Sequence, residues 1–224
     1  MPGSNRRLAR WLGALALLGF GVGNVVGLFV IRADSNQGDV QRLMYVHVPA
    51  AWLSMLSFFV VFLMSILYLV QRKRRWDQVA VSSAEIGVVF TALTLALGSI
   101  WGKPTWGVWW TWDPRLTTTA IMLAIYVGYL AIRAFAEDPD RRARWSAIVG
   151  IVGFVNVPIV YLSVVWWRTL HQPPSSPRSV APEILFTLLG NLAAFTLVYA
   201  YLMVRRVRLA EMEHRLEKLE ALHG

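Results

Sequence analysis

Two histidines, His47 and His171, are the side chains of this 224-residue chain best placed to bind a metal. Each lies at the edge of a long apolar stretch, His47 just before one and His171 just after another. A metal needs a neutral imidazole, and the partial positive charge of a helix N-terminus would keep His47 neutral. Each histidine alone is better explained as an interfacial polar group that donates to a backbone carbonyl. If both lie on one face of a membrane, however, two facing imidazoles could ligate iron in a haem plane.

Tryptophan is concentrated in one short stretch, which could supply a surface for a flat ligand. Five of the eleven tryptophans fall close together: Trp101, Trp106, Trp109, Trp110 and Trp112. Tryptophan favours the headgroup level of a bilayer, so one interpretation is an aromatic belt. Belt residues are usually spread over many helix ends, whereas a cluster in one segment favours stacking on a flat apolar ligand. The residue pattern alone leaves both interpretations open.

The shape of this tryptophan segment, residues 101–113, is predicted from its glycines and proline. Gly102, Pro104 and Gly107 argue against a regular helix through the first half. A short interfacial helix is compatible with residues 108–113. Such a helix would place four side chains on one face: Trp106, Trp109, Trp110 and Asp113.

Charged residues within and after the segment allow structural or binding roles. Asp113 and Pro114 are typical of the N-cap and first position of a helix. Arg115 and Lys103 could pair with the carboxylates of an anionic ligand, such as haem propionates, or could be solvated. Gly102 and Lys103 resemble a phosphate-binding loop only faintly, so we predict no ATP site. The chain has no cysteine, which excludes disulfides, iron–sulfur clusters and zinc–thiolate sites.

The elements that carry these residues are predicted to be membrane-spanning helices. The chain is 56% hydrophobic and 16% charged, against about 25% charged in an ordinary soluble domain. This composition argues against a soluble enzyme, a nucleic-acid-binding domain and a disordered chain. Six stretches reach the length of about 20 residues needed to cross a bilayer: 11–31, 48–70, 84–100, 116–132, 145–167 and 184–204. We therefore predict an all-α, polytopic membrane protein with six transmembrane helices and a short interfacial tryptophan-rich segment on the outer face.

The distribution of positive charge predicts the orientation of these helices. Sixteen of the 22 lysines and arginines lie on the N-terminal side of the membrane and six on the opposite side. Because positive residues favour the cytoplasm, both termini are predicted to be cytoplasmic. His47, His171 and the tryptophan segment then share the outer face. Pro49 and Pro182 are expected to begin the second and sixth helices, and Pro158 to kink the fifth.

The C-terminal tail differs in character from the rest of the chain. We divide the sequence into a six-helix transmembrane domain, residues 1–204, and a cytoplasmic tail, residues 205–224. The tail is charged but carries an apolar stripe at helical spacing: Leu209, Met212, Leu216, Leu219 and Leu222. This pattern predicts an amphipathic helix or a short coiled-coil seam. The tail either extends the sixth helix or docks on a partner.

Three motifs together resemble the haem exporter protein C family of bacterial cytochrome c maturation. Residues 101–117 (WGKPTWGVWWTWDPRLT) closely resemble the tryptophan-rich signature of haem-handling proteins. Residues 44–52 (MYVHVPAAW) and 166–173 (WWRTLHQP) resemble the two histidine segments of the family. The resemblance covers all six predicted spans in order. Related haem lyase subunits share the tryptophan signature but are longer and have more spans.

The resemblance implies a function and a set of site residues. Family members hold a b-type haem at the periplasmic face of the inner membrane, and His47 and His171 match the two axial ligands. The tryptophan segment matches the haem-contact signature, including Gly102, Gly107 and Asp113. The haem is passed to a periplasmic haem chaperone, to which it becomes covalently attached. A small single-span subunit and an ABC-type ATPase with its membrane subunit are the usual partners. The tail after Arg208 matches no family role.

Two other functions remain as alternatives to haem presentation. A b-type cytochrome redox subunit would usually ligate haem within its spans, whereas here both histidines lie at span ends. A haem-translocating channel would need a polar route, for which Asn24, Asn156, Asn191 and the Pro158 kink are the only hints within the spans. Polar residues in spans more often bond neighbouring helices. We expect presentation by positioning rather than enzymatic acid–base catalysis.

Overall fold

The computed structural model describes residues 3–172 and 180–223, and these form a bundle of helices joined by short connections. Pro173 of the second histidine motif and Arg178 lie outside the described residues. The elements are α1 (Gly3–Val25), a π-helical turn (Val26–Val30), a 3-10 helix (Asp39–Leu43), α2 (Met44–Gln71), α3 (Arg74–Trp106), α4 (Pro114–Phe135), α5 (Pro139–Phe154), α6 (Asn156–Trp166) and α7 (Pro182–His223).

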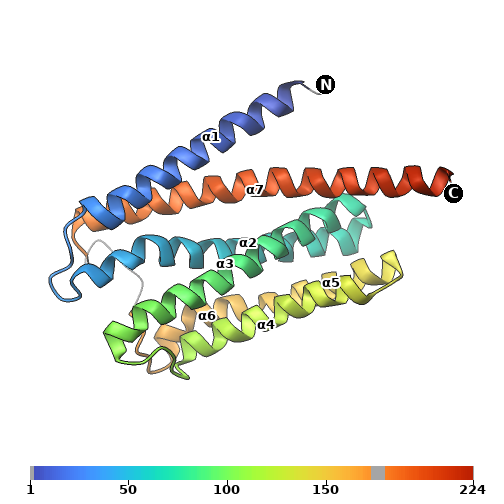
Figure 1. The fold of residues 1–224 in the computed structure, drawn as a ribbon. Coiled ribbons are helices and arrows are strands. Elements are labelled where there is room, and N and C mark those ends of the chain that lie inside the picture. Colours follow the sequence, from blue (N-terminus) through green and yellow to red (C-terminus); the bar gives the residue numbers. More distant parts are fainter. Residues whose placement is uncertain (1–2, 173–179, 224) are drawn as a thin grey trace.

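The structure confirms the prediction of an all-α protein with six spans. Within the described residues, six helical stretches are long and apolar enough to cross a membrane: Ala9–Val30, Asp39–Gln71, Arg74–Trp106, Pro114–Phe135, Pro139–Trp166 and Pro182–Glu213. The fifth of these combines α5 and α6. Both termini lie at the same end of the bundle (Figure 1). Which face of a membrane that end occupies stays a prediction from charge.

Helices α2 and α3 form a hairpin at the centre of the bundle. On one side α7 packs against the hairpin and α1 packs against α7, while α4, α5 and α6 cover the other side (Figure 1). Small residues allow the close approach of α2 and α3, because a Cβ atom at Gly87 would lie only 2.6 Å from the Phe58 ring. Ser54 and Thr91 join the same two helices through a buried hydroxyl–hydroxyl hydrogen bond of 2.6 Å. The hairpin therefore forms a tight frame on which the other helices are placed.

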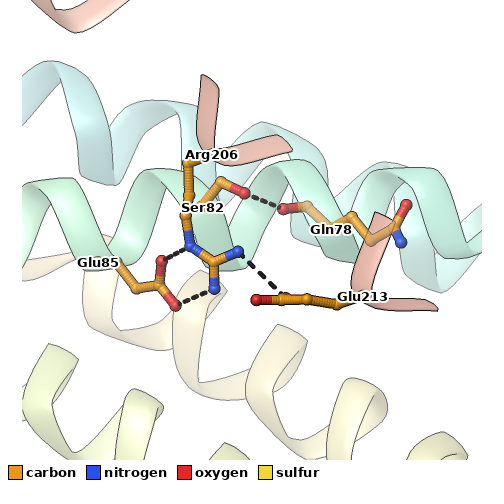
Figure 2. Close-up of polar contacts among 5 residues, drawn as sticks. All are labelled: Gln78, Ser82, Glu85, Arg206 and Glu213. Carbon is orange, nitrogen blue, oxygen red and sulfur yellow. Dashed lines mark hydrogen bonds and ion pairs between the residues drawn. The ribbon is translucent and has the colours of Figure 1, made fainter. Parts of the chain in front are cut away.

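An ion-pair cluster fixes α7 to this frame near the end that carries the termini. The Arg206 guanidinium donates to both carboxylate oxygens of Glu85 on α3, at 2.5 and 2.8 Å, and lies 3.6 Å from Glu213 (Figure 2). In the same view Ser82 donates to the carbonyl oxygen of Gln78 one turn earlier on α3. Residues 205–223 continue α7 without a break, so the tail extends beyond the other helices as one helix (Figure 1).

Proline positions only partly match the expected helix starts. Pro182 begins α7, and Pro114 begins α4 after the Asp113 N-cap, as predicted. The fifth span is interrupted between α5 and α6, just before Pro158. A proline has no N–H to bond the carbonyl of Phe154 four residues earlier, which explains the interruption. The prediction for Pro49 is wrong. Helix α2 begins at Met44, continuing from the 3-10 turn, and Pro49 is buried inside it.

The predicted shape of the tryptophan segment is also wrong. Helix α3 continues through Gly102 and Pro104 to Trp106, and residues 108–113 are not helical. Gly107 ends the helix in a left-handed conformation with φ of 80°, where its N–H donates to the carbonyl of Lys103. The Lys103 ammonium donates to the Gly107 carbonyl at 2.9 Å and closes the same turn. The helical face expected for Trp106, Trp109, Trp110 and Asp113 therefore does not form.

Candidate functional site

A mostly apolar cavity of about 310 Å³ lies at the end of the bundle opposite the termini. Helices α2, α3, α4, α6 and α7 and the segment after α6 contribute to its wall. Six of the predicted site residues line it: His47, Trp101, Gly102, Trp106, Arg115 and His171. The cavity is in the size range of small-molecule pockets, which is about 300–1,000 Å³. The fold thus brings both histidines, which are far apart in sequence, to one cavity.

His47 lies in the first turns of α2 and is held between α2 and α3. Its side chain is 7% exposed, and its Nδ1 has no hydrogen-bond partner within the described part of the chain. Gly98 leaves room for the ring, because a Cβ atom there would lie 3.2 Å from His47 Cε1. The Trp101 indole meets the imidazole edge-on, with the ring centroids 5.7 Å apart. The indole Nε1 of Trp101 donates to the side-chain oxygen of Gln37 at 3.0 Å. Because Nδ1 is buried against α3, the other ring nitrogen, Nε2, is the one that a ligand in the cavity could reach.

His171 is placed on an irregular segment that follows α6. Its ring is half-buried, and Nδ1 lies 2.8 Å from the carbonyl oxygen of Gln172. In the tautomer that donates this hydrogen bond, Nε2 keeps a free lone pair. Burial and the nearby Arg115 guanidinium lower the pKa of His171 below its ordinary value. The imidazole is therefore neutral at neutral pH, which is the form that binds a metal.

The two imidazoles lie at a spacing that suits one shared metal ion. Their ring centroids are 6.4 Å apart and their planes differ by 36°. A metal–imidazole bond is about 2.0–2.1 Å, so two such bonds plus the two ring radii add to about 6 Å. Among the described residues, no group of three or more metal-ligating side chains occurs. The pair therefore suits a metal whose other ligands come from a bound group.

Arg115 supplies positive charge to the cavity wall. Within the described lining it is the only side chain with a permanent positive charge. Its Nη1 donates to the carbonyl of Tyr161 on α6 at 3.2 Å, which leaves further donors of the guanidinium for an anionic group. Lys103, the other candidate for a carboxylate partner, does not line the cavity but bonds the Gly107 carbonyl.

The tryptophans divide into two groups. Trp101 and Trp106 line the cavity, and Gly102 lets Trp106 fold over α3, since a Cβ atom there would lie 2.9 Å from that ring. The remaining candidates lie outside the described cavity lining: Gly107, Trp109, Trp110, Trp112 and Asp113. Of these, Trp109 and Trp112 are strongly exposed, Trp112 to 81%. Haem contact by this second group stays a prediction.

Asp113 instead joins α4 to the segment that carries His171. Its carboxylate accepts hydrogen bonds from the Arg115 N–H, the Thr169 hydroxyl and the Leu170 N–H, at 2.7–2.9 Å. The Thr169 oxygen in turn accepts from the His171 N–H at 3.0 Å. The expected N-cap role is confirmed, and the contact with residues 169 and 170 is additional.

Several lining residues were missed by sequence reasoning. Four leucines of α7 form one wall of the cavity: Leu185, Leu188, Leu189 and Leu192. Their helical spacing is visible in the sequence, but the same pattern serves helix packing or lipid contact and indicates no site. Trp52 and Met55 on α2 also line the cavity, one and two turns beyond His47. Thr169, which is outside the described lining but bonds Asp113, could have been found as a hydroxyl two residues before a candidate ligand.

Comparisons with known proteins show the family of this chain. The family model described as Heme exporter protein C matches residues 3–222. The chain is 37% identical over 222 residues to Heme exporter protein C of Bradyrhizobium diazoefficiens, covering 97% of this chain and 84% of that protein. It is 36% identical over 199 residues to Heme exporter protein C of Escherichia coli (strain K12), covering 88% and 81%. A putative cytochrome c biosynthesis ccmC-like mitochondrial protein of Marchantia polymorpha is 40% identical over 150 residues, covering 67% and 63%. This chain belongs to the haem exporter protein C family.

Proposed function

We propose that this protein binds haem as cargo between His47 and His171 and presents it to a periplasmic haem chaperone during cytochrome c maturation. The names of the relatives support the general role, because they specify haem export and cytochrome c biosynthesis. The observation that carries the proposal for the site is the 6.4 Å separation of two imidazoles across an apolar cavity. Both axial positions of a haem iron would then be held by histidine.

The other lining residues fit a haem better than a bare metal ion. Two imidazoles alone leave an ion with too few ligands, whereas a porphyrin supplies four nitrogens of its own. The mostly apolar wall suits the ring, and the edge-on Trp101 and nearby Trp106 offer aromatic contact. Arg115 suits a propionate, because an arginine binds a carboxylate through two parallel hydrogen bonds. Together these groups would hold the cargo by coordination, stacking and charge.

Presentation would take place at the outer face of the bacterial inner membrane. The support is the excess of lysine and arginine at the end that carries both termini, because positive residues favour the cytoplasm and the cavity lies at the opposite end. Exposed Trp109 and Trp112 would meet the chaperone beside the cavity. The tail of α7 would then lie in the cytoplasm, within reach of the ATPase, its membrane subunit or the small single-span subunit. The protein would act by positioning haem rather than as an enzyme.

Nothing in the described residues favours the two alternative functions. The three asparagines that hinted at a polar channel bond helix backbones: Asn24 to Phe20, Asn156 to Thr118, and Asn191 to Gly23 and Thr187. Asn24 bonds within α1, Asn156 joins α6 to α4, and Asn191 joins α7 to α1, so these amides serve the helices themselves and their packing. For a b-type redox chain, a second histidine pair is needed, but His214 and His223 both lie near the C-terminus.

The decisive experiment removes each proposed ligand in turn. His47→Ala and His171→Ala should each weaken haem binding by at least about 100-fold, since even indirect supports of a ligand cost about 10–100-fold. Haem content and the Soret band of the purified protein, oxidised and reduced, provide the measurement. Added imidazole should partly restore binding to either variant. His214→Ala is the matched control and should behave as wild type. Wild-type spectra from both site variants would show that the bis-histidine proposal is wrong.

A further inference from the structure

We propose that Asp113 is a positioning residue for His171, acting through Thr169, and is not itself a haem contact. The inference rests on the proposed function, because it assumes that His171 ligates the haem iron. It changes the role implied by the family resemblance, in which Asp113 is one residue of a haem-contact signature. The support comes from the hydrogen bonds of a buried carboxylate, which is 7% exposed.

The bonds of Asp113 exceed what a helix cap requires. Oδ1 accepts from the Arg115 N–H at 2.9 Å, which is the ordinary capping bond of α4. The other bonds reach across to a segment more than 50 residues later in the sequence. The Thr169 hydroxyl donates to Oδ1 and Oδ2 at 2.9 and 2.8 Å, and the Leu170 N–H donates to Oδ2 at 2.7 Å. One carboxylate thus ties the start of α4 to the segment after α6.

Thr169 passes this constraint on to the backbone of His171. A hydroxyl has a single hydrogen, and here that hydrogen is given to the Asp113 carboxylate. The lone pairs of the Thr169 oxygen are then directed away and accept the His171 N–H at 3.0 Å. Residues 168–172 are not helical, and within the described part of the chain this relay ties the His171 backbone to the start of α4. The carboxylate fixes the direction of the hydroxyl, and the hydroxyl fixes the backbone.

The relay connects His171 to a rigid part of the protein. Helix α4 is joined to α6 by the bond from Asn156 to the Thr118 carbonyl, at 2.8 Å, and by the bond from Arg115 to the Tyr161 carbonyl. His47 is held separately, on the α2–α3 hairpin. Asp113 therefore supports the position of His171, and not that of His47, in the 6.4 Å spacing between the two imidazoles. Loss of the relay should release His171 while leaving His47 in place.

A direct contact between Asp113 and haem is disfavoured on three grounds. An ionised carboxylate has about four acceptor sites, and three donor hydrogens already point at them: the Arg115 N–H, the Leu170 N–H and the Thr169 hydroxyl, which is shared between both oxygens. A haem propionate is itself a carboxylate, so Asp113 beside it would be repelled, whereas Arg115 would attract it. The residue is also outside the described lining of the cavity.

The test uses four variants whose effects separate positioning from capping. Asp113→Asn keeps one acceptor oxygen and has an NH2 group in place of the other, so it cannot accept from both the Arg115 N–H and the Leu170 N–H, which bond different oxygens of Asp113. Thr169→Val keeps the shape of the side chain and removes the hydroxyl, while Thr169→Ser restores it. Asp138→Asn is the matched control, since Asp138 precedes Pro139 and caps α5 by accepting from the N–H groups of Asp140 and Arg141, with no link to a histidine segment.

We expect Asp113→Asn and Thr169→Val to weaken haem binding by about 10–100-fold, the effect of losing an indirect support of a metal ligand. Their oxidised spectra should shift from low-spin bis-histidine haem toward a high-spin species, and added imidazole should restore the low-spin form. Thr169→Ser and Asp138→Asn should resemble wild type. Thr169→Val is the safer variant for folding, and its elution as a monodisperse species is checked by gel filtration.

The outcomes separate the positioning role of Asp113 from the haem ligation on which it rests. Wild-type affinity and low-spin spectra in both Asp113→Asn and Thr169→Val would overturn the positioning role and leave the proposed function intact. An equal loss of haem in Asp138→Asn would also overturn it, because the effect would then come from helix capping in general. Failure of the wild-type protein itself to give a bis-histidine spectrum would instead remove the proposed ligation on which the inference rests.

Discussion

Gly98 provides a sensitive test of how His47 is held, because one added methyl group would press on the imidazole. A Cβ atom at position 98 would lie 3.2 Å from His47 Cε1 and 3.8 Å from Nδ1. The shorter separation is tighter than ordinary van der Waals contact, so the ring must shift by a few tenths of an ångström. His47 is buried, so the shift forces the side chain away from its preferred rotamer.

The size of the effect follows from the cost of that distortion. A side chain forced off its rotamer costs about 0.5–1.5 kcal/mol, and every 1.4 kcal/mol is tenfold, so Gly98→Ala should weaken haem binding about two- to tenfold. Folding is affected in the opposite direction, because alanine in place of a helical glycine gains about 0.5–1 kcal/mol. We therefore expect haem affinity to fall while thermal stability stays nearly unchanged.

The assay is a spectroscopic haem titration of the purified apoprotein in detergent, with a thermal melt of the same samples. Gly128→Ala on α4 is the matched control, since a Cβ atom there would meet nothing within 4 Å. It should gain stability and bind haem as wild type does. If Gly98→Ala bound haem as tightly as Gly128→Ala, the backbone of α3 would not determine the position of His47.

Three further predictions concern other parts of the molecule. Trp106→Ala should weaken haem binding itself by about 0.5–1.5 kcal/mol of lost aromatic contact, whereas Trp109→Ala, outside the cavity, should leave haem affinity unchanged and slow transfer to the chaperone in a reconstituted assay. Truncation after Arg208 should spare the haem spectrum but reduce copurification of the ATPase or small subunit; an unchanged yield of both partners would make the tail a simple extension of α7. Hydrogen bonds from the N–H groups of Arg141 and Asp140 lower the pKa of Asp138 below 3.8. The Asp138 carboxylate therefore stabilises the fold above pH 3.8, and this contribution is lost as the pH falls through the lower pKa of the folded protein. The difference in Tm between wild type and Asp138→Asn should persist at neutral pH and shrink only in that acid range.

The positions of the spans could be predicted because bilayer thickness imposes a minimum length on every apolar stretch. Local rules failed where tertiary contacts opposed them. Pro104 and Gly102 weaken a helix, yet α3 continues past both because Trp101 is anchored by Gln37 and the next turn is closed by the Lys103–Gly107 bonds. The Trp101–Gln37 bond joins residues 64 apart in sequence, so no local window contains it, and the Lys103–Gly107 bonds are local but form only because the helix reaches Trp106.

The candidate site was predictable to a different degree for each kind of residue. The two histidines stood out because imidazole is rare among apolar spans and has a specific chemistry. The leucines of α7 could not be singled out, because nothing in their type separates a cavity wall from a lipid-facing surface. Asp113 was assigned a cap correctly, but its bonds to residues 169 and 170 depend on the folded arrangement of α4 and α6.

The uninterrupted course of α7 gives the molecule the mechanics of a lever. Leu189 in the cavity wall precedes the Arg206–Glu85 cluster by 17 residues, or about 25 Å along the helix axis, and Leu216 in the tail follows it by ten residues, or about 15 Å. For a stiff rod pivoting at Arg206, a tilt of about 5° moves the tail by about 1.3 Å and the cavity wall by about 2 Å in the opposite direction. A displacement of the tail would therefore move the cavity wall by a larger amount, with no helix needing to unfold.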